Sequence, residues 1–276
     1  MSQKWVKKAS GEIVEFDEEK LKQSLFNSGA SEELIEGIVN TIDAGLTETT
    51  STRSIYKKAY QLLRSSSQKL AGKYKLKTAI LELGPSGYPF EHFVGQLLAF
   101  QGYDVEVGIE IQGKCLSHEV DIFAHTDDHL IVGECKHHGN PGYKSDIKVP
   151  LYVHSRYNDI VAGLQSTGEN REAECWIITN TRFTTDSEQY GSCYGLKLIA
   201  WDFPKKGNLR ERVELSGLYP ITCLFSLSKR EKQILMDEDI VLCQQISANP
   251  DLLNPIDPRK HSRILAECEE ICSSSS

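Results

Sequence analysis

Charged residues interrupt two short apolar segments in the middle of the chain, and their types and spacing could do chemistry. The first segment, Glu119–Phe123, has Asp121 at its centre, and the second, Leu130–Lys136, ends with Glu134 and Lys136. Because side chains alternate along a strand, Glu134 and Lys136 share one face. If the segments pair as a hairpin with Asp121 facing them, two carboxylates and an ammonium group meet. Charges in apolar strands are costly unless they share a site.

Two carboxylates at one place are suited to a hard divalent cation. Mg²⁺ (or Mn²⁺) prefers oxygen ligands, keeps several waters and binds phosphate oxygens. A lysine beside the ion can orient or deprotonate the attacking water and offset charge on a scissile phosphate. The alternative is an edge hairpin with one surface ion pair, Glu134–Lys136 or Asp121–Lys136, and the three residues alone leave both interpretations open. Glu91 lies on a preceding helix that could close over the hairpin.

Other polar residues flank this constellation. A zinc cluster around Cys135 is disfavoured, since alternation points Cys135 away from the face of Lys136. The neighbouring histidines are therefore interpreted as polar walls of the site: His118, His137 and His138. Three further residues are candidates for contact with a nucleic acid backbone, and fit equally well as surface residues without a role: Asp146, Lys148 and Arg156.

Hydrophobic periodicity predicts the elements that must position these residues. We expect strands at Val105–Ile111, Glu119–His125, Leu130–Cys135, Cys175–Thr179 and Leu196–Trp201, and helices at Pro89–Gln101 and Val149–Gln165. Strands that alternate with helices indicate an α/β fold with a mixed sheet flanked by helices. The breaker cluster Leu83–Gly87 marks the linker before this segment.

The flanking segments differ from the centre. A small β-hairpin (Val6–Lys8 and Ile13–Phe16, around a Ser10-Gly11 turn) precedes three expected helices at Glu18–Asn27, Ser31–Ala44 and Ser51–Leu70, with N-caps Asp17, Ser31 and Ser51. After Pro220 we expect short helices at Lys229–Leu235, Ile240–Ile246 and Arg259–Cys272, then a disordered Ser tail. The predicted domains are therefore residues 1–83, 84–221 and 222–276.

Composition limits the class of protein. The chain has 276 residues, 31 basic and 39 acidic, with a net charge of −8, 39% hydrophobic residues and eight cysteines without a CxxC pair. These values predict a cytoplasmic globular protein with reduced thiols, no secretory signal and no membrane span. Net acidity argues against coating nucleic acid by charge alone. The basic charge is concentrated early, because Arg53–Lys77 holds eight basic residues and no acidic one.

The segment from Gly87 to about Phe203 resembles the Mrr-type restriction endonuclease domain of the PD-(D/E)xK nuclease superfamily. The resemblance rests on ordered motifs: Tyr88-Pro89-Phe90-Glu91 opening a helix, Val120-Asp121-Ile122, Glu134-Cys135-Lys136, and Trp176 to Thr184, before a final strand–helix–strand. It implies metal-dependent DNA hydrolysis with Asp121 and Glu134 as metal ligands, Lys136 at the nucleophilic water and Glu91 as an auxiliary acid. Val120 departs from the proline in the superfamily's name.

Residues 4 to about 82 resemble an ATP-cone, a regulatory nucleotide-binding module. The matching positions are Val6, Lys8, Gly11, Phe16, Asp17, Lys20 and Leu21, with Ser54-Ile55 and Ala71, Tyr74 and Leu76 further on. Ala9 and Ser10 replace the usual arginine and aspartate. The resemblance implies that Lys8 and Lys20, helped by Lys7, hold the phosphates of ATP or dATP as an effector. No GxxxxGK[ST] loop is present, so ATP hydrolysis is not expected.

Together these features predict a Mg²⁺-dependent DNA endonuclease whose activity or assembly responds to an adenine nucleotide. The alternative is a nucleotide-gated DNA-binding protein without nuclease turnover, which the net charge of −7 in residues 84–221 favours. A third hypothesis is a scaffold that forms a homo-oligomer through the ATP-cone alone. The last 55 residues vaguely resemble a helix-hairpin-helix unit, and a helical cap or oligomer interface explains them equally well.

Overall fold

A five-stranded mixed sheet lies in the middle of the chain in the computed structural model, which describes residues 4–8, 11–47 and 50–273. The first three strands are antiparallel and the last three parallel. In spatial order the strands are β3 (Asp104–Gln112), β4 (Ser117–His125), β5 (His129–Lys136), β7 (Glu172–Thr179) and β9 (Lys197–Ile199). The mixed α/β class and the hairpin are confirmed. The hairpin lies inside the sheet, so the edge-hairpin interpretation is wrong.

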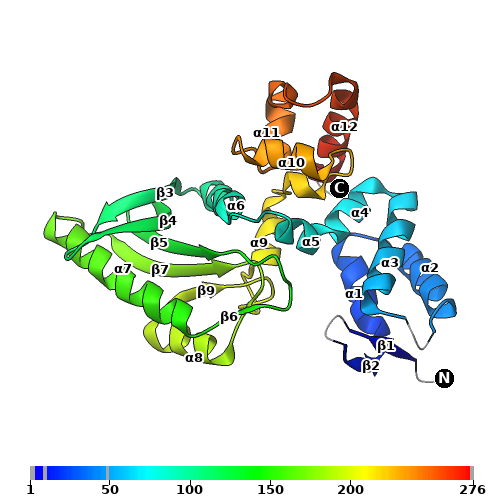
Figure 1. Cartoon of the computed structure of the whole chain (residues 1–276), viewed down its shortest axis with the longest axis horizontal. Coiled ribbons are helices and arrows are strands. Elements are labelled where there is room, and N and C mark those ends of the chain that lie inside the picture. The colour runs from blue at the N-terminus through cyan, green and yellow to red at the C-terminus, as the bar shows by residue number, and fades with distance from the viewer. Residues whose placement is uncertain (1–3, 9–10, 48–49, 274–276) are drawn as a thin grey trace.

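Helices cover both faces of the sheet (Figure 1). On one face α6 (Tyr88–Phe100) packs Phe93 and Val94 in the same core as Ile122 and Ile131. On the other face α7 (Lys148–Ser166) buries Ile160 against residues of β3, β4 and β5, and α8 (Thr185–Tyr194) lies beside it. A two-stranded parallel sheet, β6 (Lys144–Ser145) with β8 (Arg182–Phe183), holds the loops at the end of β5 and β7.

The N-terminal segment has a separate apolar core. Its elements are β1 (Trp5–Lys7), β2 (Ile13–Glu15), α1 (Glu18–Asn27), α2 (Glu32–Ala44), α3 (Thr52–Ser66) and α4 (Gln68–Tyr74). Asp17, Ser31 and Ser51 each accept a backbone N–H in the first helical turn, which confirms the three predicted N-caps. Ser10 of the predicted turn, and Ala9 beside it, lie outside the described residues.

One long helix over Ser51–Leu70 was expected here, and this prediction is wrong. Ser67 adopts an extended conformation (φ −157°, ψ 125°) that ends α3, and its side chain accepts from the Leu70 N–H to begin α4. Serine competes for backbone donors in this way and therefore favours caps over helix interiors. The break therefore divides the basic run between two helices, α3 and α4.

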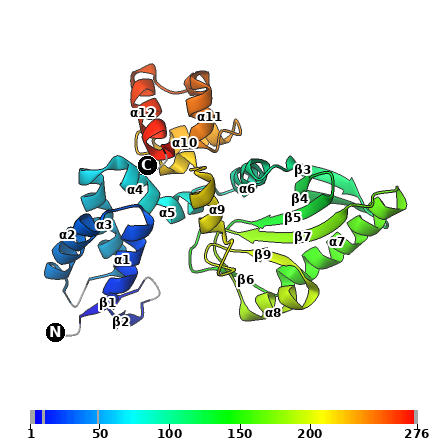
Figure 2. The same ribbon diagram turned by 180° about the vertical axis from the view of Figure 1, so that it is seen from behind.

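The C-terminal region is helical, as predicted, and packs on the linker to the sheet (Figure 2). It contains η1 (Ile221–Cys223), α10 (Lys229–Met236), α11 (Cys243–Ala248), η2 (Pro250–Leu253), η3 (Pro258–Lys260) and α12 (His261–Cys272). These helices share one core with α5 (Leu76–Leu81) and α6. Buried Glu267 of α12 accepts the backbone N–H groups of Phe225 and Ser226 at 2.6 and 3.0 Å. The predicted disordered tail, from Ser274 on, lies outside the described residues.

Residue patterns alone did not predict α5, α8 or α9 (Leu209–Ser216), and α5 and α9 lie between the sheet and the N-terminal helices (Figures 1 and 2). Backbone hydrogen bonds from Leu209 to Ala200 and from Arg210 to Trp201 tie the start of α9 to the end of the sheet. No helix in the described part of the chain has the length and apolarity that a membrane crossing requires.

Candidate active site

The apolar side chains of β3 and β4 switch from one face of the sheet to the other at Gly108 and Asp121. On one side of these two residues, the paired Val107 and Ile122 pack in the α6 core. On the other side, the paired Ile109 and Val120 pack in the α7 core. Gly108 has a positive φ of 64°, which glycine adopts without the steric penalty of a side chain. The local twist turns the Asp121 side chain out of the regular alternation of β4.

The carboxylate of Asp121 occupies the position where the β4–β5 ladder ends. Backbone pairing stops at Ile122 and Gly133, and Asp121 Oδ2 instead accepts the Cys135 N–H at 2.8 Å. This hydrogen bond fixes the carboxylate beside the end of β5. Asp121 and Glu134 therefore lie opposite each other where the two strands separate.

Glu134 is a buried anion held by two cations. It is 3% exposed, and its carboxylate pairs with Lys136 through Oε1 and with Arg156 of α7 through Oε2. The Arg156 side chain is 11% exposed and that of Lys136 is 37% exposed, so only the lysine reaches solvent. Glu134 and Lys136 share a face, as alternation predicted. The interpretation as a surface ion pair is wrong, because Glu134 is enclosed.

Glu91, in the first turn of α6, completes an acidic group around Asp121. Burial and the negative charges of Asp121 and Glu119 raise the pKa of Glu91 to about 7, although Lys136 opposes them. Burial also raises the pKa of Asp121, against the Cys135 hydrogen bond and the charges of Lys136 and Arg156. The site therefore holds desolvated carboxylates that repel one another near neutral pH, an arrangement that a bound cation would relieve.

Replacing Glu91 by glutamine should stabilise the fold at pH 8 but not at pH 5. The pKa of this group rises from 4.5 to about 7 on folding, so its charged form costs stability as the pH rises through that window. After discounting for partial exposure, we expect a gain of about 1 kcal/mol at pH 8. Urea unfolding at both pH values measures it, with Glu106→Gln on exposed β3 as control. An equal gain at pH 5 would contradict the assignment.

The end of β7 holds the end of β5 in place. Thr179 Oγ1 donates to the Lys136 carbonyl at 2.7 Å. The Asn180 amide, 1% exposed, accepts the His138 N–H at 2.8 Å and donates to the His138 carbonyl at 2.9 Å. These bonds fix the backbone on which Lys136 is carried.

Asn180→Ala should therefore destabilise the protein by about 1–2 kcal/mol, since it leaves a partly buried donor and acceptor of His138 without their protein partner. Asn140→Ala is the matched control, because the exposed Asn140 makes only a local bond to the Gly142 N–H at 2.9 Å. Denaturant unfolding of both variants measures the difference. If both variants lose the same free energy of unfolding, the Asn180 hydrogen bonds contribute no more to stability than a local surface bond.

The three histidines do not form a zinc site with Cys135. His118 pairs with Asp159 at 2.8 Å, whereas His137 lies 3.3 Å from the Ile80 carbonyl. His138 lies 3.0 Å from the Ser145 hydroxyl, and Cys135 packs in the α6 core. Among the residues that the structure describes, no group of three or more His, Cys, Asp or Glu side chains is placed to hold a metal ion.

Arg156 is the site residue whose role the sequence analysis missed. It was a candidate for contact with nucleic acid, yet its guanidinium is buried against Glu134. The signal lies in α7, where Val153, Tyr157 and Ile160 pack toward the sheet at helical spacing and Arg156 falls within the same stripe. Asp146 and Lys148 are exposed, and Asp146 accepts the Lys148 N–H at 2.9 Å.

Two of the three predicted phosphate-binding lysines line a separate cavity of about 390 Å³ in the N-terminal segment. Lys8 and Lys20 line it, together with Glu15, Asp17, apolar residues of β1, β2 and α3 and the ring of Tyr74. Lys8 pairs with Glu12 at 2.9 Å and Lys20 with Asp17 at 2.7 Å, both at exposed positions where such pairs contribute little. Lys7 does not line this cavity, because it alternates with buried Val6.

Comparison with known proteins gives relatives without a described activity. Residues 219–272 match the family model "AF1548-like, C-terminal". The chain is 29% identical over 181 residues to an uncharacterized protein of Archaeoglobus fulgidus, an alignment that covers 64% of this chain and 99% of that protein. It also resembles the crystal structure of a protein of unknown function, AF1548, with a TM-score of 0.56 and 29% identity over 67% of this chain and 97% of that one. The Mrr-type and ATP-cone resemblances stay predictions.

Proposed function

We propose that this protein is a metal-dependent nuclease that hydrolyses DNA phosphodiester bonds, with its activity or assembly regulated by an adenine nucleotide such as ATP or dATP. One observation carries the proposal: Asp121, Glu134 and Lys136 converge where the central β4–β5 hairpin separates, with the half-buried Glu91 beside them. Charged groups inside an apolar sheet cost stability, and their presence there therefore indicates a functional site.

The donor set fits Mg²⁺ or Mn²⁺. Asp121 and Glu134 supply hard carboxylate oxygens from adjacent strands, and burial raises the pKa of Asp121 although Lys136 and Arg156 lie nearby. Two protein ligands suffice for an ion that keeps waters and binds phosphate oxygens. When bound, the ion would polarise the scissile phosphate and lower the pKa of a coordinated water.

Three residues of the chain supply the other functions that the hydrolysis requires. Lys136 extends from the buried Glu134 toward solvent, where its ammonium can orient the attacking water and offset charge on the phosphate. Arg156 pairs with Glu134 from the α7 side and holds its carboxylate in place, so it is a positioning residue. Glu91, with a pKa of about 7, can exchange a proton near neutral pH.

The nucleotide part of the proposal is supported by the N-terminal cavity. Its wall combines apolar side chains and the Tyr74 ring, suited to a base, with Lys8 and Lys20, suited to phosphates. Both lysines are bound only in exposed ion pairs, which a phosphate can displace at small cost.

Nicking of supercoiled plasmid DNA tests the proposal. We expect cleavage that requires Mg²⁺ or Mn²⁺, changes when ATP is added, and is lost in Asp121→Ala. Metal and ATP should be varied independently, and a gel-shift assay on the same samples should record binding. Cleavage that survives chelation, or that Asp121→Ala leaves intact, would refute the proposed site.

The second candidate function is nucleotide-gated DNA binding without turnover. The pairing of Glu134 with both Lys136 and Arg156 favours it, because these cations already neutralise the carboxylate without a metal. DNA binding without nicking at any Mg²⁺ or Mn²⁺ concentration would support this second function over the first.

A further inference from the structure

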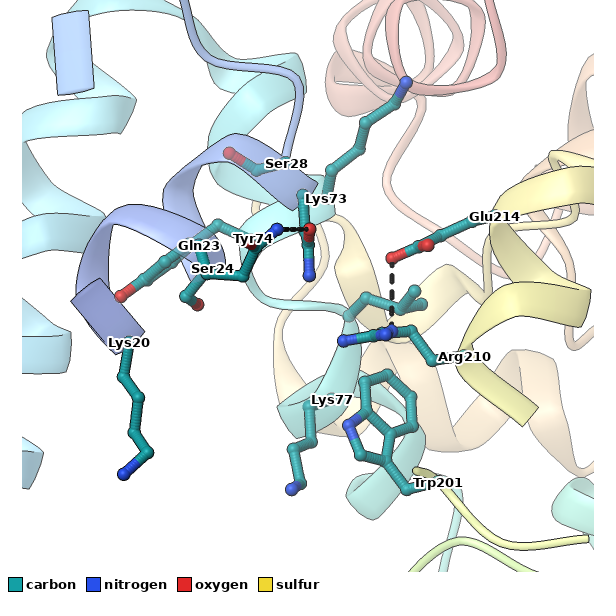
Figure 3. A pocket seen from close by; sticks show the side chains of 12 residues that line it. Lys20, Gln23, Ser24, Ser28, Lys73, Tyr74, Lys77, Trp201, Arg210 and Glu214 are labelled. Atoms are coloured by element: carbon teal, nitrogen blue, oxygen red, sulfur yellow. Dashed lines mark hydrogen bonds and ion pairs between the residues drawn. The ribbon is translucent and has the colours of Figure 1, made fainter. Parts of the chain in front are cut away.

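A second hollow, of about 240 Å³, lies where the N-terminal helices meet the end of the central sheet (Figure 3). One wall belongs to α1, α4 and α5, and the other to Trp201 and α9. We call it the junction pocket; the residues that line it are Lys20, Gln23, Ser24, Asn27, Ser28, Lys73, Tyr74, Leu76, Lys77, Trp201, Arg210 and Glu214. None of the predicted catalytic residues lines it.

The lining of the junction pocket is strongly basic, with four cationic side chains and a single acidic one, Glu214. The ammonium of Lys73 lies 5.6 Å from the Tyr219 ring centroid and is directed away from the opening. Lys20 and Lys77 extend toward the same side of the pocket, and Arg210 lies beside Trp201 (Figure 3). Three cations from α1, α5 and α9 therefore surround the opening.

Two of these cations have an acidic partner, since Lys20 pairs with Asp17 at 2.7 Å and Arg210 pairs with Glu214. The Nε atom of Arg210 is buried without a hydrogen-bond partner among the described residues, and Glu214 Oε1 lies 3.9 Å away. Burial and the charges of Arg182 and Arg210 lower the pKa of Lys77, although Asp202 opposes them. An unsatisfied buried donor next to crowded cations is the environment in which an anion with several oxygens gains most.

The junction pocket adjoins the 390 Å³ cavity. Lys20, Ser24 and Tyr74 line both hollows, and Lys20 and Ser24 lie one turn apart on α1. The two hollows therefore share one wall, and a ligand that occupies both would pass beside Lys20. The larger cavity is mainly apolar and the smaller one is basic, which matches the two ends of a nucleotide.

We propose that the junction pocket binds the phosphate groups of a nucleoside triphosphate whose base lies in the larger cavity, so that the nucleotide joins α1 and α5 to α9. The inference rests on the nucleotide regulation proposed above and deepens it. Arg210 lies in the first turn of α9 next to the end of the sheet, and its backbone N–H donates to the Trp201 carbonyl. Phosphates bound there would link the N-terminal helices to the sheet that carries the candidate active site.

Isothermal titration of the full chain with inorganic tripolyphosphate and, separately, with ATP tests the inference. Arg210→Gln and Lys77→Met should each weaken both ligands about tenfold, the effect of losing one charge-assisted contact. Lys58→Met is the matched control: it removes an exposed lysine of α3 that lines neither hollow, and should change both affinities less than twofold. Fluorescence of a variant in which Trp201 is the remaining tryptophan (Trp5→Phe, Trp176→Phe) gives a second readout, and melting temperatures confirm that each variant is folded.

The outcomes separate this inference from the proposed function. Phosphate binding in the junction pocket is ruled out if the wild-type protein does not bind tripolyphosphate. It is also ruled out if Arg210→Gln and Lys77→Met bind both ligands with wild-type affinity. If Lys8→Ala then still weakens ATP, nucleotide binding in the larger cavity stands without it. If ATP binds no more tightly than tripolyphosphate while both variants lose affinity, the pocket is an anion site and the nucleotide assignment fails.

Discussion

Replacing Lys136 by alanine is expected to lower the rate of Mg²⁺-dependent DNA cleavage by about 10³-fold while leaving the protein folded. The ammonium is the cation of the site that reaches solvent, so it is the group placed to meet an attacking water and a phosphate oxygen. Its removal leaves Glu134 paired with Arg156, and the buried carboxylate keeps a partner. Lys136→Ala should therefore lower the cleavage rate without an equivalent loss of folding stability.

Lys205→Ala is the matched control for this loss of charge, because Lys205 is exposed in the turn that follows β9, outside the candidate site. Nicking rates at saturating Mg²⁺ and circular dichroism melts should be compared for both variants. If Lys136→Ala cleaves DNA at the rate of Lys205→Ala, Lys136 has no part in the reaction. A variant that loses its fold would show that Lys136 is needed mainly to neutralise Glu134.

Most of the sheet could be predicted from the sequence because its strands and its two long helices repeat apolar residues over many positions. The β4–β5 hairpin and α7 agree with expectation to within a few residues. The eight-residue helix α9 was missed, since it buries only Leu209 and Val213 and offers little periodicity. The break at Ser67 was also missed, because a serine between two helical patterns is visible only through its backbone conformation.

The candidate site was predictable in part for the same reason. Alternation along β5 is sufficient to place Glu134 and Lys136 on one face. The approach of Asp121 depends on the positive φ of Gly108, a backbone property of a different strand that residue patterns do not report. Arg156 lies twenty residues beyond β5, and its pairing with Glu134 depends on how α7 is rotated over the sheet.

Arg156→Ala should be the most destabilising change at the site. Removing one partner of a buried ion pair costs about 3–5 kcal/mol, and we expect the lower end because Lys136 still contacts Glu134. Arg182→Ala is the matched control: its pair with Asp202 at 3.0 Å is about half exposed, so the loss should be within about 1 kcal/mol. Urea unfolding without divalent ions measures both, and equal losses would contradict the burial of the Glu134 pair.

Mg²⁺ should restore part of the stability that Arg156→Ala loses, because a cation bound by Asp121 and Glu134 can replace the missing guanidinium. Binding to the folded state alone adds about 1.4 kcal/mol at ten times the Kd. The same Mg²⁺ should stabilise the wild type less, since Arg156 competes for Glu134, and should not stabilise a variant that also carries Asp121→Asn. If Mg²⁺ leaves Arg156→Ala unchanged, the two carboxylates do not form a metal site, and DNA binding without turnover becomes the better account of this protein.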